Sequence, residues 1–341
     1  MILKRMIAVP IHRVRVRKGL ALAGASTLAF AGCSSDTDSI AEREAPPTES
    51  SSEPDVNIVA TTTIWADIAS RSLCGLEVAS VIPAGADPHT FETSLADRAT
   101  LEQADLVVAN GLALEEGLVD LLATVADGGT PVIEMTEAVA IRDMGDEHAD
   151  DEDHDHDDKD HADEHHHDHS GSDPHIWLDP INVASTVNLI TEAAIDAGFD
   201  TSVRACAQDF IGEIEALDIE IAADLSAIAS DRRFLVTNHD ALGYFAERYG
   251  FEVVGTVIPS LSTLAETNPA DLADLAAIIE ELDIPTVFSE EQASARDADA
   301  LADAIPGLTV VALDTGSLRD TDDDYLSMMR RNVTAIAEAL G

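Results

Sequence analysis

Positive charge is scarce in this sequence of 341 residues. Lys and Arg number 19 against 66 Asp and Glu, which leaves a formal net charge of −47 at pH 7. Such an acidic surface repels phosphates, so nucleic acids and anionic lipid headgroups are poor partners for it. The excess runs along the whole chain, which fits a salt-rich habitat as well as a functional demand, and it attracts cations without specificity.

Acidic residues are absent from residues 1–32. This basic segment ends in an apolar run from Gly19 to Gly32, which is too short to span a bilayer comfortably and is typical of an export signal. Its last residues are similar to a bacterial lipobox, Phe30-Ala31-Gly32-Cys33. We therefore expect a lipoprotein signal peptide and a lipidated Cys33 that anchors the protein to the outer face of the cell membrane. A soluble secretory signal with an incidental cysteine is the alternative.

Apolar residues are also nearly missing from residues 33–55, which are rich in Ser, Glu, Asp and Pro. Such a segment cannot fold by burial, so it is predicted to be a disordered tether. No Walker A pattern and no transmembrane segment follow it. An ATPase and a channel are therefore expected only as separate chains.

Cysteine is rare, with three residues in the whole chain. Beyond Cys33 only Cys74 and Cys206 remain. In an exported protein two remaining cysteines favour a disulfide, and two buried free thiols are the alternative.

From Val56 onward, short β-rich runs alternate with longer stretches of helical periodicity. The first set of predicted strands is Val56–Thr61, Glu77–Ile82, Asp105–Asn110 and Pro131–Glu134. The second set is Phe234–Thr237, Glu252–Val257, Pro285–Ser289 and Leu308–Leu313. Repeated β-α units predict an α/β fold with two lobes of parallel sheet flanked by helices, at residues 56–198 and 231–341.

Between the two sets, apolar residues recur at steps of three and four from Val203 to Ile228. The pattern predicts one linking helix within residues 199–230, nearly 30 residues and roughly 40 Å long. We expect it to be a rigid strut that joins the lobes.

A low-complexity insert of His, Asp and Glu interrupts the first lobe at residues 143–172. It has no apolar face and is predicted to be a disordered loop. A match to a zinc-peptidase signature at His161–His165 is expected by chance in such a tract. The insert is either a weak zinc collector or a solvated spacer. Its eight histidines are His148, His154, His156, His161, His165, His166, His167 and His169.

Outside the leader and the insert the chain holds only three histidines: His89, His175 and His239. The first two lie in the repeated phrases Asp-Pro-His-Thr-Phe and Asp-Pro-His-Ile-Trp, in which proline restricts the direction of the imidazole. His239 and Asp314 each follow a predicted strand, and ligands of open α/β sheets bind at the carboxyl ends of strands. The pattern favours a metal site between the lobes. The alternatives are two unrelated turns, a core histidine at His239 and a turn residue at Asp314.

Six segments of the chain resemble the zinc/manganese-binding subunits of bacterial ABC importers, which are solute-binding lipoproteins. They lie in order along the sequence: Val81–His89, Asp173–Pro180, Thr237–Phe245, Ile258–Glu266, Phe288–Gln292 and Leu313–Asp314. The resemblance implies two α/β lobes bridged by one long helix, with the metal in the cleft. The ligands it implies are His89, His175, His239 and Asp314. Zinc members of this family often carry a His/acid-rich loop where this chain has residues 143–172.

Three imidazoles and one carboxylate suit tetrahedral Zn²⁺, whereas manganese prefers more oxygen. Manganese members of the family tend to place glutamate at the position of His239, so we expect zinc. Glu290 is expected to orient a histidine without binding the ion. Trp177 should lie close enough to report metal binding.

The function predicted from the sequence is a high-affinity Zn²⁺ receptor for zinc homeostasis, acting outside the membrane. It would be a monomer and would deliver zinc, its transported ligand, to an ABC permease served by a separate ATPase. A manganese receptor of the same family is the alternative. A zinc-dependent exported enzyme is less favoured because no general base stands at a known peptidase spacing. An adhesin or metallochaperone would share the same site.

Overall fold

The computed structural model describes residues 56–143 and 171–341. The predicted signal peptide, Cys33, the tether and the eight histidines of the insert lie outside the described residues. The ends of the insert are described: Asp143 and Ser172 form an antiparallel bridge, and the Ser172 hydroxyl donates to Asp143 at 2.9 Å. No helix in the described part of the chain combines the length and apolarity needed to cross a bilayer.

The first sheet is parallel, as predicted, with strand order β2-β1-β3-β4. Its strands are β1 (Ile58–Ala60), β2 (Ala79–Ser80), β3 (Leu106–Ala109) and β4 (Val132–Glu134). The helices around it are α1 (Thr63–Ser72), α2 (Leu95–Glu102), α3 (Val119–Asp127) and α4 (Pro180–Asp196). Short 3-10 segments occupy Glu116–Leu118, Met135–Ala138 and Ile176–Leu178.

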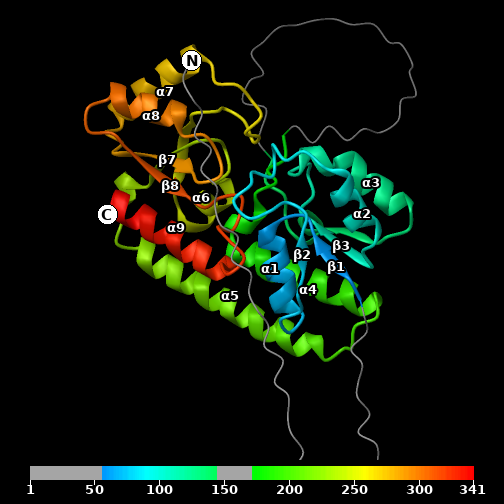
Figure 1. Ribbon diagram of the computed structural model, residues 1–341. Helices are drawn as coiled ribbons and strands as arrows, with labels where there is room; N and C mark the ends of the chain where they lie inside the picture. Colours follow the sequence, from blue (N-terminus) through cyan, green and yellow to red (C-terminus); the bar gives the residue numbers. More distant parts are fainter. Residues whose placement is uncertain (1–55, 144–170) are drawn as a thin grey trace, which may run out of the picture. The chain divides into compact units, whose positions relative to one another are not determined.

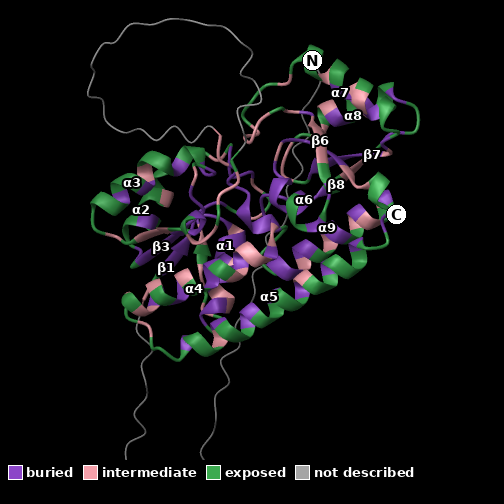
Figure 2. Ribbon diagram, turned by 180° about the vertical axis from the view of Figure 1, so that it is seen from behind, coloured by how far each residue is buried: buried purple, intermediate pink, exposed green. Residues whose placement is uncertain are grey.

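The central strands β1 and β3 are buried on both faces, since successive side chains of a strand point to opposite sides and both sides are covered. Ile58 and Ala60 of β1 join a core cluster with α1 and α4, while Val59 joins a second cluster with α2 and α3. This two-sided burial explains why the strands are apolar runs without alternation. Figure 2 shows β1 and β3 buried and the outer faces of the helices exposed.

The second sheet repeats the arrangement, with strand order β6-β5-β7-β8, all parallel. Its strands are β5 (Phe234–Thr237), β6 (Glu252–Thr256), β7 (Thr286–Glu290) and β8 (Thr309–Leu313). The helices are α6 (Gly243–Tyr249), α7 (Pro269–Glu281), α8 (Arg296–Ala304) and α9 (Tyr325–Leu340), with a 3-10 turn at Ser230–Arg232. Two parallel sheets flanked by helices confirm the predicted fold class.

Between the sheets in sequence lies α5 (Val203–Leu225), which passes beside α4 and α9 (Figure 1). Its 23 residues are fewer than predicted, because the chain leaves the helix at Ser226 and Ile228 packs into the core from a turn. Ion pairs fasten α5 to helices of both halves: Arg71–Glu213, Arg248–Asp218 and Arg330–Glu220. The rigidity of this helix stays a prediction.

A disulfide joins Cys74, just beyond α1, to Cys206 in the first turns of α5. The bond confirms the predicted pairing. It closes a loop with a sequence separation of 132 residues, so it removes many conformations from the unfolded chain.

We expect the double variant Cys74→Ser/Cys206→Ser to lose about 2–4 kcal/mol of unfolding free energy, because its unfolded chain regains that freedom. Urea denaturation with and without reductant measures the effect. Reductant should destabilise the wild type to the level of the variant and leave the variant unchanged. A wild type insensitive to a reductant that has fully broken the bond would contradict this expectation.

Asp67 on α1 accepts the backbone N–H of Tyr325, the first residue of α9, at 2.9 Å. Burial raises the pKa of Asp67 to about 6, although this hydrogen bond and Arg71 act in the opposite direction. A carboxyl with a raised pKa in the folded state binds its proton more tightly than in the unfolded chain. Asp67 therefore costs no stability below about pH 4, and it lowers the free energy of unfolding progressively as the pH rises from there through 6.

We expect Asp67→Asn to raise the free energy of unfolding by about 1–2 kcal/mol at pH 7.5, since the amide oxygen still accepts from Tyr325 and carries no charge. The gain should shrink as the pH falls below about 6 and be lost near pH 3, where the carboxyl is protonated in the folded and the unfolded chain. Denaturation at both pH values measures it, with Asp209→Asn on the exposed face of α5 as the control for general charge. Equal gains for the two variants at pH 7.5 would refute the assignment to Asp67.

Candidate metal centre

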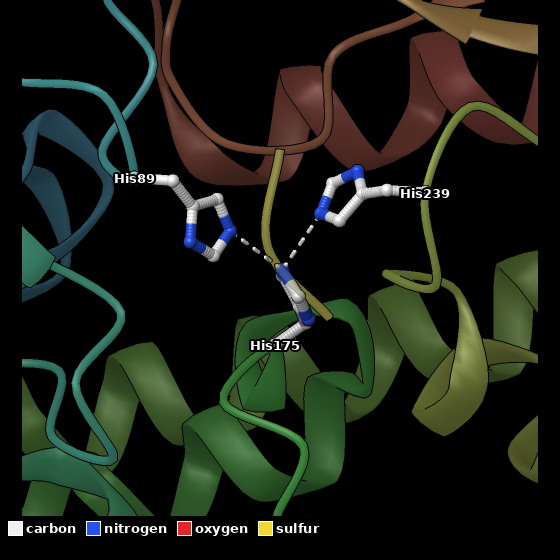
Figure 3. A group of neighbouring side chains, drawn as sticks. All are labelled: His89, His175 and His239. Atoms are coloured by element: carbon white, nitrogen blue, oxygen red, sulfur yellow. Dashed lines mark hydrogen bonds between the residues drawn. The ribbon is translucent and has the colours of Figure 1, made fainter. Parts of the chain in front are cut away.

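Three imidazoles from distant parts of the chain meet in one buried cluster (Figure 3). His89 lies in the loop after β2, His175 directly precedes the 3-10 turn at Ile176–Leu178, and His239 follows β5. The Nε2 atom of His175 lies 3.2 Å from Nε2 of His89 and 3.1 Å from Nε2 of His239. All three rings are almost fully buried. The structure thus brings together the three histidines that the sequence analysis singled out as candidate ligands.

The two Asp-Pro-His phrases form the same local turn. The Oδ1 atom of Asp87 accepts the backbone N–H of His89 at 3.0 Å, and Oδ1 of Asp173 accepts that of His175 at 3.0 Å. Proline between them has no N–H of its own and holds φ near −65°. The repeated sequence therefore presents two imidazoles from matching turns.

A carboxylate faces the other nitrogen of each ring. Nδ1 of His175 lies 2.9 Å from Asp173, and Nδ1 of His239 contacts Glu290 at hydrogen-bond distance. Nδ1 of His89 lies 3.7 Å from Glu116, an ion-pair distance, and finds no hydrogen-bond partner among the described residues. A carboxylate that accepts from Nδ1–H leaves the Nε2 lone pair free, which is the tautomer a metal requires.

Burial and charge set the protonation of the cluster. Burial, reinforced by the positive charge on His239 and His89 when they are protonated, lowers the pKa of His175 well below its usual value. Burial alone would also lower the pKa of His239, but the charge and hydrogen bond of Glu290 outweigh it and raise that pKa. Burial raises the pKa of Asp173 to about 6, against the hydrogen bond from His175 and the charge of Arg142.

The donor set fits a divalent cation. When His175 and His239 are neutral and carry their proton on Nδ1, facing a carboxylate, their unprotonated Nε2 atoms point toward each other. Such lone pairs repel unless a cation lies between them. Bonds of about 2.0–2.1 Å in a tetrahedral site place neighbouring ligand nitrogens about 3.3 Å apart, close to the observed 3.1 and 3.2 Å.

Asp314, the fourth ligand predicted, is not in this cluster. Its carboxylate is buried and accepts from Nε of Arg319 at 2.8 Å and from Nε of Arg331 at 3.0 Å. The two following residues, Thr315 and Gly316, line the cavity that holds the histidines. Both oxygens of the carboxylate therefore accept hydrogen bonds from guanidinium groups in this structure. A ligand role for Asp314 stays a prediction.

Trp177 lies beside the cluster, with its ring centroid 5.4 Å from that of His175. Its Nε1–H donates to the Thr315 carbonyl at 2.7 Å, which ties the turn after His175 to the segment after β8. A tryptophan in this position will sense charge placed among the imidazoles.

Glu116 and Asn110 contribute to the site although the sequence did not single them out. Asn110 donates to the carbonyl of Pro174 at 2.9 Å and accepts from Trp65 Nε1 at 2.9 Å, so it fixes the peptide before His175. Its own backbone N–H donates to the buried Glu115 carboxylate at 2.9 Å. The only signal for Asn110 is its place before a glycine at the end of a buried strand. Glu116 has none, since its partner is distant along the chain.

We expect Asn110→Asp to lower the free energy of unfolding by about 1–3 kcal/mol, because the new carboxylate can accept from Trp65 but cannot donate to Pro174. Urea denaturation at pH 7.5 measures the loss. Asn57→Asp, at an exposed position with a side-chain donor to the Gln103 carbonyl, is a matched control and should lose less. Equal losses would show that Asn110 does not brace the His175 turn.

Comparisons with known proteins give a consistent picture. A family described as "Zinc-uptake complex component A periplasmic" matches residues 58–339. The zinc-binding protein TroA of Treponema pallidum is 26% identical over 266 residues, which are 75% of this chain and 79% of that protein. The manganese-binding lipoprotein MntA of Halalkalibacterium halodurans is 27% identical over 269 residues, covering 77% and 81% of the two chains.

The fold agrees with solved structures of similar proteins. The structure of periplasmic zinc-binding TroA from Treponema pallidum superposes with a TM-score of 0.72 at 25% identity, covering 84% of this chain and 99% of that one. A manganese-bound periplasmic protein from candidatus Liberibacter asiaticus superposes with a TM-score of 0.68 at 21% identity, covering 84% and 100%. The second likeness concerns the fold alone.

Proposed function

Because the chain belongs to the family of periplasmic zinc-uptake components A, we propose that it is a high-affinity Zn²⁺ receptor acting outside the membrane. It binds one zinc ion at His89, His175 and His239 and delivers the ion to the permease of an ABC importer. The observation that carries the proposal is the convergence of three buried Nε2 atoms, each on a ring whose Nδ1 faces a carboxylate. Zinc is the cargo of this site.

The choice of zinc over manganese rests on the donor atoms. The relatives include proteins named for each metal, so similarity alone does not choose between them. Three imidazole nitrogens suit zinc, whereas manganese favours carboxylate, carbonyl and water oxygens. Glu290 contacts Nδ1 of His239 through its Oε1 atom, so its role is to orient that ring.

Asp314 completes the site as the fourth ligand. Its backbone directly precedes the cavity residues Thr315 and Gly316, which supports a rotation of the side chain toward the histidines when the ion binds. A shell closed by protein ligands suits capture and transfer of an ion, whereas an open position would suit catalysis. The reported relatives are named for binding, which supports a receptor over an enzyme.

The remaining parts of the proposal concern where the receptor acts. A lipidated Cys33 holds the folded part near the membrane, residues 33–55 serve as its tether, and the permease and ATPase are separate chains. The name of one relative as a lipoprotein supports the anchor. The histidines of the insert collect zinc weakly, and the receptor works as a monomer.

We expect protein purified without added metal and then titrated with zinc to bind one tight equivalent, measured by competition with a chromogenic chelator. His89→Ala and His239→Ala should each weaken this binding by at least about 100-fold, because a ligand is lost from a buried shell. Manganese should compete poorly, and Trp177 fluorescence should follow the zinc titration.

Deletion of residues 144–170 is the matched control, since it removes eight histidines but none of the three clustered ones. It should abolish several weak equivalents and leave the tight one. Tight zinc binding that survives in both alanine variants, or a preference for manganese, would reject the proposed function.

A further inference from the structure

The surroundings of Asp314 point to a residue that regulates how tightly the ion is held. We propose that Arg319 sets the zinc affinity of the receptor by competing with the metal for the Asp314 carboxylate. This inference rests on the proposed function, in which Asp314 is the fourth ligand. It assigns to Arg319 a role in affinity and release that does not require contact with the ion.

Asp314 is held so that only its side chain can move. Asn332 on α9 accepts the backbone N–H of Asp314 at 2.8 Å and donates to its carbonyl at 2.8 Å. The next carbonyl, that of Thr315, accepts from Trp177. With the main chain fixed on both sides, the carboxylate exchanges between the arginines and the histidines by rotation about side-chain bonds.

The two arginines that hold Asp314 are not equivalent. Arg331 is fixed by Asp323, with two further hydrogen bonds of 2.7 and 2.6 Å to its carboxylate. Arg319 reaches Asp314 through a single nitrogen, Nε at 2.8 Å, and its side chain is 49% exposed. Arg319 is therefore the partner that can leave.

A cavity and a second carboxylate lie beside Arg319 and can accommodate its side chain once it leaves Asp314. A surface cavity of about 320 Å³ is lined by Asp314, Arg319 and Glu291, together with Gly85, Gln292 and Ser317. The carboxylate of Glu291 lies 3.6 Å from Arg319 across this cavity, which is an ion-pair distance. When Asp314 turns toward the metal, Arg319 keeps a negative partner and remains solvated.

The competition follows from the charges. A carboxylate whose oxygens both accept from guanidinium groups must give up a charge-assisted hydrogen bond before it can bind a cation. Zinc binding is weakened by the free energy of that bond, and departure of the ion is assisted by its return. A receptor that must release its zinc to a permease needs an interaction of this kind, which competes with the bound ion.

The test compares Arg319→Gln with the wild type in the chelator competition assay. Glutamine removes the charge but keeps a polar side chain at an exposed position, and we expect zinc to bind about tenfold more tightly and to dissociate more slowly. Arg319→Lys keeps the charge and should stay within about threefold of the wild type. Arg204→Gln is the matched control, since Arg204 is 48% exposed and paired with Glu192, and it should leave zinc affinity unchanged.

The double variant Arg319→Gln/Asp314→Asn decides the mechanism, with Asp314→Asn alone as its reference. We expect Asp314→Asn to weaken zinc binding and to abolish the gain from Arg319→Gln, because there is no carboxylate left to release. A gain that persists in the double variant would mean that Arg319 acts on the ion through space, and it would overturn the proposal.

The outcomes also separate this inference from the proposed function. If Asp314→Asn weakens binding but Arg319→Gln does not tighten it, Asp314 is a ligand and the competition is wrong. If neither variant changes zinc affinity while His89→Ala abolishes it, the fourth-ligand assignment fails, and the competition with it. Loss of the tight site is tested by the histidine variants alone.

Discussion

Three imidazole rings meet in one buried space, and the other features of the site follow from the need to accommodate their facing nitrogens. Nε2 atoms 3.1 and 3.2 Å apart repel through their lone pairs whenever both are unprotonated, and rings so fully buried have little water to relieve that repulsion. The carboxylates of Asp173 and Glu290 favour this form, because each can accept from a proton on the Nδ1 atom that it faces. A small divalent cation that prefers nitrogen ligands removes the repulsion, so the cluster favours an ion of that kind.

The fold supports this constraint from two directions. His89 and His175 come from matching Asp-Pro-His turns in the first half of the chain, and His239 follows the central strand β5 of the second sheet. Continuous apolar packing extends from β1 through α5 to β8 and α9, so the two groups of histidines share one core. The disulfide and the ion pairs of α5 add connections between elements that are distant in sequence.

The charges around the histidine cluster differ sharply from those around Asp314. The histidines face acidic side chains only through their outer nitrogens, whereas Asp314 meets two guanidinium groups. The chain has 19 basic and 66 acidic residues, so it is unusual that two of its arginines pair with one buried carboxylate. This concentration is what distinguishes the surroundings of Asp314 from an ordinary turn after a strand.

The α/β class, the parallel sheets, the cysteine pair and the importance of the three histidines could be predicted from the sequence alone. These follow from local signals, namely apolar runs, turn chemistry, and the rarity of histidine outside the insert. Four features became visible only in the folded protein: the end of α5 at Leu225, the hydrogen bond from Asn110 to Pro174, the approach of Glu116 to His89 and the arginines around Asp314. The physical reason is that hydrogen bonds and ion pairs between distant segments depend on where side chains meet in space, and no periodicity along the chain encodes that meeting.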